Sequence, residues 1–271
     1  MEKLTLADKT VLVTGASSGL GLEMARQLAR DFKAHPILVA RRKDKLETLA
    51  KELESYGVKP RVIAADMTKP EDVARLFADA TSTPLHAAIL NAGVTYFGKT
   101  LDHENDDIAS LIATNVTSVI HLTQQLVPYL VQRNESGGVM IVSSMASFQP
   151  MPFQAVYGGS KAFVTSYATA LAEEVRDQSV SVTTFCPGGI ATEMMDGAGL
   201  STKYPKGHAM VMDVEPCARL AIDAFIGRKV LFVPGGLNKM AAVAAQLAPR
   251  GLVTRLVAND YRGALPTKGS A

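Results

Sequence analysis

The chain has 271 residues, of which 47% are hydrophobic and 20% charged, and its formal net charge is +2 at pH 7. This length and composition are ordinary for one α/β domain with a substantial core, so we expect a single domain over residues 1–271. The mild charge gives no support for nucleic-acid binding. The five histidines are dispersed, and Cys186 and Cys217 lack a CxxC spacing, so we expect no metal site and no disulfide framework.

Seven short apolar runs alternate with helical patterns along the chain. We predict strands at residues 10–14, 36–40, 60–65, 86–90, 138–143, 180–185 and 229–233. Strands that alternate with helices indicate a parallel sheet, and right-handed crossovers put helices on both of its faces. The expected fold class is therefore α/β, a doubly wound Rossmann-type parallel sheet of seven strands, with ligands at the carboxyl ends of the strands.

A glycine-rich turn, TGASSGLG at residues 14–21, follows the first predicted strand and opens into an amphipathic helix from about residue 20 to residue 32. A strand, a glycine turn and a helix in this order form a phosphate cradle. Gly15 permits the turn, Gly19 lets the backbone approach a pyrophosphate, and Gly21 allows close helix packing. The spacing is GxxxGxG rather than GxGxxG, so the usual dinucleotide fingerprint applies only by analogy.

The residues after the second predicted strand bear on the choice of cofactor. Enzymes that use NAD place an acidic residue there to bind the ribose hydroxyls, whereas this chain has Arg41 and Arg42. A guanidinium suits a 2′-phosphate because its planar fork donates paired hydrogen bonds. We therefore predict NADP(H) ahead of NAD(H), with Arg41 ahead of Arg42 as the main contact. The alternative is that both arginines only begin a solvated helix.

Tyr157 and Lys161 are four residues apart in a helical pattern, and Tyr157 follows Ser144 by thirteen positions. Side chains at i and i+4 share one helix face, so the Lys161 ammonium can lie beside the Tyr157 phenol and favour its ionised form. A free tyrosine has a pKa of about 10, which is too high for good proton transfer at neutral pH. A nearby cation and an oxidised nicotinamide would bring that pKa toward the working range. With the glycine turn, these residues describe a hydride-transfer site.

These motifs, in this order, resemble the short-chain dehydrogenase/reductase family, whose single-domain members carry a TGxxxGxG turn and a YxxxK pair. The resemblance covers residues 8 to about 235 and implies the strand order 3-2-1-4-5-6-7. It also rests on Asp66, Asn91-Ala92-Gly93, Asn115 in a long helix, and Pro187-Gly188 with Thr192. Leu90 stands where many members have the first asparagine of an NNAG motif, but Asn91 remains available to steady the central strands.

The resemblance also implies roles for the site residues. Tyr157 would be the general acid/base, and the Ser144 hydroxyl would hydrogen-bond the same substrate oxygen. Lys161 would lower the Tyr157 pKa and bind the nicotinamide ribose, and Asn115 would anchor a water that links Lys161 to solvent. Ser143 competes with Ser144, and the thirteen-residue offset favours Ser144. The residues expected to contact the cofactor are Gly15, Ser17, Ser18, Gly19, Leu20, Gly21, Arg41, Arg42, Asp66, Met67, Asn91, Ala92, Gly93, Tyr157, Lys161, Pro187, Gly188, Ile190 and Thr192.

Residues 193–213 predict a mobile lid, with glycines at 197, 199 and 207 and methionines at 194, 195, 210 and 212. Methionine side chains adapt to irregular apolar shapes, so we expect a small-molecule substrate, a hydrophobic ketone, aldehyde or alcohol that is lipid-derived or aromatic. The alternative is that these methionines only pack the lid against the body of the protein.

Residues 236–271 predict a C-terminal helical extension, with helices near 238–247 and 252–258 separated by Pro249. Pro249-Arg250 interrupts any apolar run that approaches the roughly 20 residues of a transmembrane span. The extension has three interpretations: it covers its own core, completes a subunit interface, or lies on a membrane surface. We favour packing against protein because the basic residues are few and the apolar ones moderate in size. We expect a cytoplasmic homodimer or homotetramer.

The sequence thus predicts an NADP(H)-dependent oxidoreductase that interconverts a carbonyl and a secondary alcohol. The alternatives on the same fold are an NAD(H)-dependent alcohol dehydrogenase and a 3-oxoacyl reductase. A non-catalytic dinucleotide sensor would be expected to lose Tyr157, Lys161 or Ser144, and all three are present. Isomerases and dehydratases that use transient oxidation usually carry a longer substrate domain.

Overall fold

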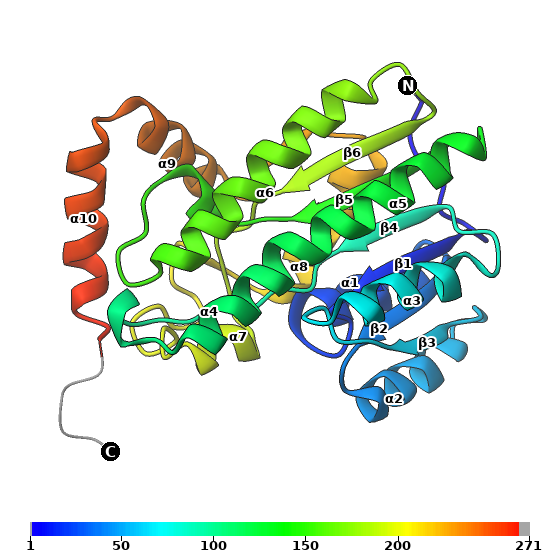
Figure 1. Cartoon of the computed structure of the whole chain (residues 1–271), viewed down its shortest axis with the longest axis horizontal. Helices are drawn as coiled ribbons and strands as arrows, with labels where there is room; N and C mark the ends of the chain where they lie inside the picture. Colours follow the sequence, from blue (N-terminus) through cyan, green and yellow to red (C-terminus); the bar gives the residue numbers. More distant parts are fainter. Residues whose placement is uncertain (1, 266–271) are drawn as a thin grey trace.

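The computed structural model describes residues 2–265, and its strands form a seven-stranded parallel sheet in the order β3-β2-β1-β4-β5-β6-β9 (Figure 1). The strands are β1 (Thr10–Thr14), β2 (His35–Ala40), β3 (Arg61–Ala64), β4 (Ala87–Leu90), β5 (Gly137–Val142), β6 (Val180–Phe185) and β9 (Leu231–Phe232). All seven predicted strands are present, and the predicted order is confirmed.

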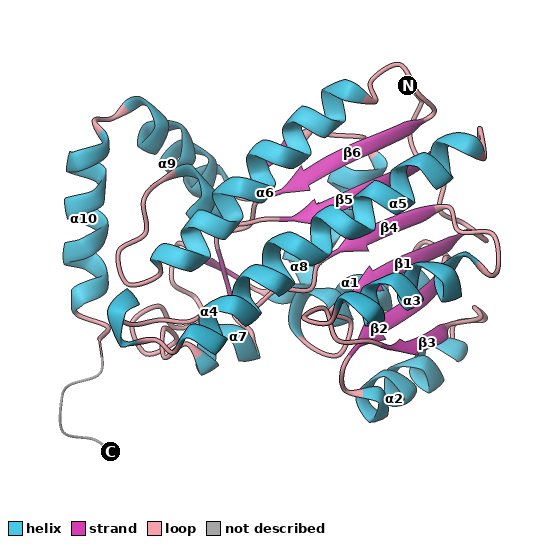
Figure 2. Cartoon of the chain, in the orientation of Figure 1, coloured by secondary structure: helices cyan, strands magenta, loops and turns pink. Residues whose placement is uncertain are grey.

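Helices cover both faces of the sheet (Figure 2). They are α1 (Gly19–Arg30), α2 (Lys43–Glu54), α3 (Pro70–Thr81), α4 (Asn105–Ile112), α5 (Ser118–Gln132), α6 (Ala155–Glu174) and α8 (Val214–Ile226), with short 3-10 turns at Thr100–Asp102 and Met145–Phe148. A π-helical turn over Ala113–Thr117 joins α4 to α5, so the long helix expected around Asn115 contains a widened turn at that residue. Within residues 2–265, no helix combines the length and the apolar character needed to cross a membrane.

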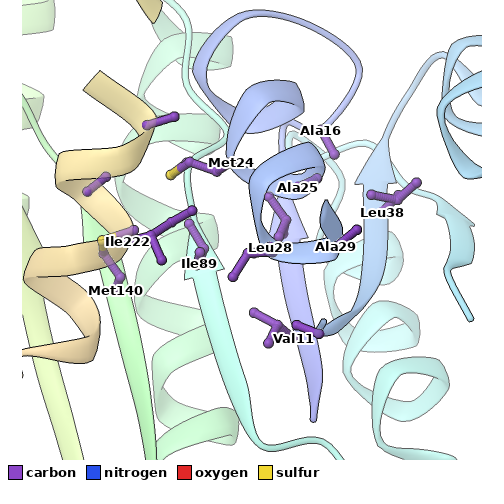
Figure 3. Packing of buried hydrophobic residues seen from close by; sticks show 14 of the residues in the cluster. Val11, Ala16, Met24, Ala25, Leu28, Ala29, Leu38, Ile89, Met140 and Ile222 are labelled. Atoms are coloured by element: carbon purple, nitrogen blue, oxygen red, sulfur yellow. The ribbon is translucent and has the colours of Figure 1, made fainter. Parts of the chain in front are cut away.

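Alternate side chains of the strands pack into two cores, one on each face of the sheet. Val11 and Val13 of β1 belong to the core that includes α1 and α8, while Leu12 belongs to the core that includes α3, α5 and α6. Figure 3 shows part of the first core, where α1 residues pack over the strands and toward Ile222 of α8. Each large apolar side chain contributes roughly 1.5 to 3 kcal/mol to the free energy of folding when it is fully buried. The two cores therefore hold the strands, and the loops at their ends, in fixed positions.

The chain beyond β6 adds elements that the sequence predicted only in part. β7 (Gly189–Ile190) pairs in parallel with β8 (Val211–Met212), and α7 (Glu193–Gly197) lies between them in the chain. The predicted lid over residues 193–213 is therefore fastened at its base by a short ribbon. The two predicted tail helices are confirmed as α9 (Gly236–Leu247) and α10 (Arg250–Arg262). Residues 266–271 of the predicted extension lie outside the described residues.

Candidate active site

The loops that follow the carboxyl ends of the strands border a cavity of about 540 Å³. Every residue predicted to contact the cofactor lines this cavity except Gly21, and Ser144, Tyr157 and Lys161 line it as well. Asn115 does not. The topology thus brings together predicted cofactor residues that are up to 177 positions apart, from Gly15 to Thr192.

The glycine turn has the backbone geometry of a phosphate cradle. Gly15 and Gly19 have φ of +69° and +55°, in the left-handed region that favours glycine. A Cβ on Gly21 would lie 2.4 Å from the Gly15 carbonyl oxygen, so only glycine lets α1 begin so close to the turn. α1 begins at Gly19, and Ser18 and Leu20 line the cavity, so the N-terminus of this helix borders it. The turn therefore fits the pyrophosphate of a dinucleotide.

Asn91 ties the glycine turn to the neighbouring strand. The backbone N–H groups of Asn91 and Ala92 each donate to Thr14 Oγ1 at 3.0 Å, and the Asn91 side-chain amide donates to the Thr14 carbonyl at 3.0 Å. These bonds join the ends of β1 and β4, so the predicted role of Asn91 in steadying the central strands is confirmed.

The end of the cavity beyond β2 and β3 carries Arg41, Arg42 and Asp66. The Arg42 guanidinium donates to Ser17 Oγ (3.1 Å) and Ser18 Oγ (3.0 Å) of the glycine turn. Burial acts to raise the pKa of Asp66, but hydrogen bonds from Thr68 and the charge of Arg41 outweigh it and leave that pKa lowered. The cluster therefore combines two permanent cations with one ionised carboxylate.

Lys161 and Tyr157 lie together on α6, as their i, i+4 spacing predicts. The Lys161 Nζ atom is 5.9 Å from the centroid of the Tyr157 ring and donates to the Val142 carbonyl oxygen at 3.0 Å. Burial lowers the pKa of Lys161 to about 8. Burial also raises the pKa of Tyr157, and the interaction with the Ser144 hydroxyl opposes that rise only in part.

The direction of the Tyr157 shift corrects the sequence-based expectation. Lys161 was expected to lower the Tyr157 pKa, but the loss of solvent around the buried phenol dominates here. The phenol is consequently held in its protonated form, which is the form that can donate a proton.

The two serines after β5 have different surroundings. The Ser143 hydroxyl donates to the Lys161 carbonyl oxygen (3.1 Å) and lies within hydrogen-bond distance of Thr165 Oγ1 (2.6 Å). The Ser144 hydroxyl accepts from the Ala146 N–H (3.1 Å) and faces Tyr157. This geometry agrees with the choice of Ser144 over Ser143.

Asn115 is buried at the π-helical turn, with 1% of its surface exposed. Its Oδ1 accepts from the Val94 N–H (2.9 Å), and its Nδ2 donates to the Val94 carbonyl (2.9 Å) and to Ser160 Oγ (3.1 Å). The side chain thus clamps the loop after β4 to α6, behind the cavity. In this structure Asn115 acts as a positioning residue, and its role as a water anchor stays a prediction.

A further group of residues that the sequence did not predict also lines the cavity. Tyr204 of the lid and Val257, Asp260 and Tyr261 of α10 line the cavity. The Tyr204 hydroxyl donates to the Asp260 carboxylate, which also pairs with Lys203 Nζ at 2.9 Å. One signal was present in the sequence, since Asp260 is the single acidic residue of the extension over residues 236–271.

Aromatic contacts surround Tyr261 on this side of the cavity. Its ring centroid lies 5.6 Å from that of Phe97 and 6.1 Å from that of Tyr204, both with edge-on geometry. Burial raises the pKa of Tyr261 to about 12. Tyr261 is therefore a neutral, largely apolar wall at neutral pH. Within the described part of the chain, no three His, Cys, Asp or Glu side chains are grouped to hold a metal ion.

A doubly wound sheet with a phosphate cradle and a Ser-Tyr-Lys group at its carboxyl edge defines an oxidoreductase of the nicotinamide-dinucleotide class. Comparison with known proteins agrees, because residues 9–201 match the family model of the short chain dehydrogenases. The chain belongs to the short-chain dehydrogenase/reductase family.

The chain is also similar to individual proteins of this family. Over 188 residues, 64% of its length, the chain is 36% identical to the very-long-chain 3-oxoacyl-CoA reductase of Schizosaccharomyces pombe, and it spans only 54% of that protein. It is 28% identical to a short-chain dehydrogenase from Sphingobium yanoikuyae solved in complex with NADPH, with a TM-score of 0.79 over 97% of this chain and 98% of that one.

A second solved structure shows the same fold with the other cofactor. This is a short-chain dehydrogenase/reductase from Burkholderia phymatum in complex with NAD, 20% identical, with a TM-score of 0.81 over 99% of each chain. The comparisons therefore support a nicotinamide dinucleotide cofactor without choosing between NADP and NAD.

Proposed function

We propose that this protein is an NADP(H)-dependent oxidoreductase that interconverts a carbonyl and a secondary alcohol on an apolar substrate, with Tyr157 as the general acid/base. The observation that carries the proposal is the meeting of Tyr157, Ser144 and Lys161 at a cavity that the glycine turn also borders. A proton donor, an oxyanion partner and a buried cation at one point are what carbonyl reduction requires.

Tyr157, Ser144 and Lys161 have different roles in the proposed reaction. A bound nicotinamide dinucleotide would supply or accept the hydride. In the reductive direction Tyr157 donates its proton to the carbonyl oxygen, and the Ser144 hydroxyl donates a hydrogen bond to the same oxygen as negative charge develops there. The Lys161 ammonium, held by the Val142 carbonyl, stabilises the phenolate that remains. Alcohol oxidation uses the same groups in reverse.

Residues around the cavity would hold the dinucleotide. The N–H groups of the turn at Gly15 and Gly19 would bind the pyrophosphate, and Lys161 would bind the nicotinamide ribose. Arg41 and Arg42 would receive the 2′-phosphate. Preference for NADP(H) is supported by the absence of a carboxylate at positions 41 and 42 and by the NADPH complex of the Sphingobium relative. NAD(H) is the alternative cofactor.

The substrate end of the cavity supports an apolar substrate. It is lined by Met194, Met195 and Leu200 of the lid, by Met151, and by Val257 and Tyr261 of α10. The Asp260 charge is balanced by Lys203, so this wall presents little net charge to a substrate. A 3-oxoacyl thioester is the second candidate, since the Schizosaccharomyces relative is named as a 3-oxoacyl-CoA reductase. A cytoplasmic location and a homodimer or homotetramer stay predictions.

A screen of apolar ketones, aldehydes and 3-oxoacyl thioesters, followed by NADPH absorbance and product analysis, tests the proposal. We expect at least one apolar ketone to be reduced with one NADPH consumed per alcohol formed. If the protein binds NADPH but converts a substrate without net consumption, it is an isomerase or dehydratase. If it binds NADPH and turns over nothing in the screen or in the reverse alcohol assay, the sensor interpretation replaces ours.

A further inference from the structure

Apolar side chains on α9 and α10 point away from the rest of the protein. Of the twelve large hydrophobic residues that are exposed in the described chain, six lie on these two helices: Leu237, Met240, Val243, Leu247, Leu252 and Leu256. Met240 is 65% exposed, Leu247 82% and Leu256 60%. We call these six residues the outer face.

The spacing of the outer face shows that its exposure is organised. Leu237, Met240 and Leu247 recur on one side of α9, whereas Asn238 and Ala242 on the opposite side are buried. A Cβ on Gly188 would lie 2.6 Å from Asn238 Nδ2, so this buried side is seated on a loop that lines the cavity. Since α9 already packs through its other side, the outer face is not needed to attach the helix to its own core.

Basic residues accompany the outer face. Residues 236–265 contain Lys239, Arg250, Arg255 and Arg262, all exposed, and one acidic residue, Asp260. The Asp260 carboxylate is committed to Lys203 and Tyr204. Arg255 follows Leu252 by three positions and so flanks it on the surface of α10. Apolar side chains flanked by cations are typical of helices that lie in the interface of an anionic bilayer.

A second copy of the chain fits this face less well. In a two-fold contact the same patch lies on both subunits, so the basic residues would lie opposite their own copies. An anionic lipid surface pairs with the same residues favourably, and each basic residue near such a surface adds attraction.

The outer face lies on the opposite side of α10 from residues that line the cavity. Val257 and Tyr261 on the inner side of α10 line the cavity, while Leu252 and Leu256 lie on its exposed side. Figure 1 shows α9 and α10 as a bent pair at the end of the molecule toward which the strands point. A surface that covers the outer face would therefore lie against the helix whose other side lines the cavity.

We propose that the outer face of α9 and α10 docks on an anionic lipid bilayer, with Lys239, Arg250, Arg255 and Arg262 toward the headgroups. This reverses the ranking that the sequence alone favoured, because the structure shows that the tail covers its own core with one side and leaves an apolar side exposed. The docking is peripheral.

Flotation of the full chain with vesicles tests the proposal. We expect the protein to float with phosphatidylcholine vesicles that contain phosphatidylglycerol, and to float less with phosphatidylcholine alone. The double variant Leu247→Ser, Leu252→Ser should lower the vesicle-bound to free ratio at least about 10-fold, because two exposed apolar anchors are lost. The double variant Leu101→Ser, Val230→Ser removes two exposed apolar side chains elsewhere and should float normally.

Two double charge-reversal variants measure how much electrostatic attraction contributes to vesicle binding. Arg250→Glu, Arg255→Glu should reduce binding at least about 10-fold, whereas Lys51→Glu, Lys59→Glu on the far side of the sheet should not. Flotation needs no turnover, so its outcome is independent of the proposed reaction. If the intact chain stays unbound on anionic vesicles, the proposal is wrong. It is also wrong if light scattering shows an oligomer that Leu247→Ser, Leu252→Ser dissociates, because the face is then a protein interface.

Discussion

Arg42 and Glu193 join two sides of the cavity: the Arg42 Nη1 atom lies 3.5 Å from the Glu193 carboxylate at the start of the lid. Lys45 Nζ approaches the same carboxylate at 3.7 Å. All three side chains are at least two-fifths exposed, so the stability this cluster adds is small and depends on salt. The cluster matters more for the choice of cofactor. The Glu193 carboxylate places a negative charge beside Arg42, one of the two arginines proposed to bind a 2′-phosphate.

Arg41→Ala tests how the protein distinguishes the two cofactors. Charge-assisted hydrogen bonds contribute roughly 1.5 to 3 kcal/mol, so NADPH should bind about 10- to 100-fold more weakly to this variant while NADH binding hardly changes. Lys43→Ala is the matched control, because Lys43 pairs with Glu47 and does not line the cavity. Fluorescence titration with both cofactors measures the effect. Equal losses for NADPH and NADH would mean that Arg41 does not contact the phosphate.

Glu193→Gln should have the opposite effect on the same titration. Removing the carboxylate frees Arg42 and Lys45 for the 2′-phosphate, so NADPH should bind about 2- to 5-fold more tightly at low salt, with NADH little changed. The gain should shrink as ionic strength rises. A loss of NADPH affinity in Glu193→Gln would show that the carboxylate helps to bind the cofactor and does not compete with it.

The low pKa of Lys161 predicts a pH-dependent stability. Burial puts its pKa near 8 in the folded protein, below the value of about 10.4 in an unfolded chain. Between these values the unfolded state binds more protons, so this group adds stability as pH rises from about 8 to about 10.4 and loses it again as pH falls.

Thermal unfolding of the cofactor-free protein measures this contribution. Lys161→Met has no such group, so its melting temperature minus that of the wild type should fall between pH 7 and pH 10. Lys59→Met, at an exposed position, is the matched control for the loss of a lysine. A constant difference for Lys161→Met would place the Lys161 pKa near its ordinary value.

Tyr261 is predicted to position the substrate from α10. Tyr261→Ala removes a ring that lines the cavity and should raise KM for an apolar substrate about 10-fold or more, with NADPH affinity unchanged. Tyr261→Phe keeps the ring and its contact with Phe97, and should retain most of the activity. Steady-state kinetics and a cofactor titration separate the two effects. Equal KM values for Tyr261→Ala and the wild type would show that Tyr261 does not contact the substrate.

The sheet was predictable because its strands are buried on both faces and appear as short apolar, β-branched runs. β6 shows this clearly, with all six residues from Val180 to Phe185 buried. The edge strand was less predictable: the run at 229–233 pairs with β6 only through Leu231 and Phe232. The β7–β8 ribbon was missed because strands of two residues carry no periodicity.

The site residues were also predictable only where their relation is local in the sequence. Tyr157 and Lys161 were found because their relation is local, four positions on one helix. Tyr204 and Asp260 were missed because they are 56 positions apart and meet only through the packing of α10 on the lid. The Tyr157 pKa was expected to fall, since the spacing revealed the neighbouring cation but not the extent of burial around the phenol.

We propose that Tyr157 carries the proton in an NADPH-dependent carbonyl reduction, and turnover by Tyr157→Phe is the decisive measurement. The measurement is the rate of NADPH consumption with the best ketone of the screen, alongside NADPH affinity, for the wild type, Tyr157→Phe and Tyr167→Phe. Tyr167 is the matched control because it lies on α6 like Tyr157, while its hydroxyl shares a hydrogen bond with Thr123 of α5 and does not line the cavity. We expect Tyr157→Phe to lose at least about 100-fold in rate with NADPH affinity nearly intact, and Tyr167→Phe to keep its rate. A Tyr157→Phe rate above about a tenth of the wild type would mean that Tyr157 does not carry the proton.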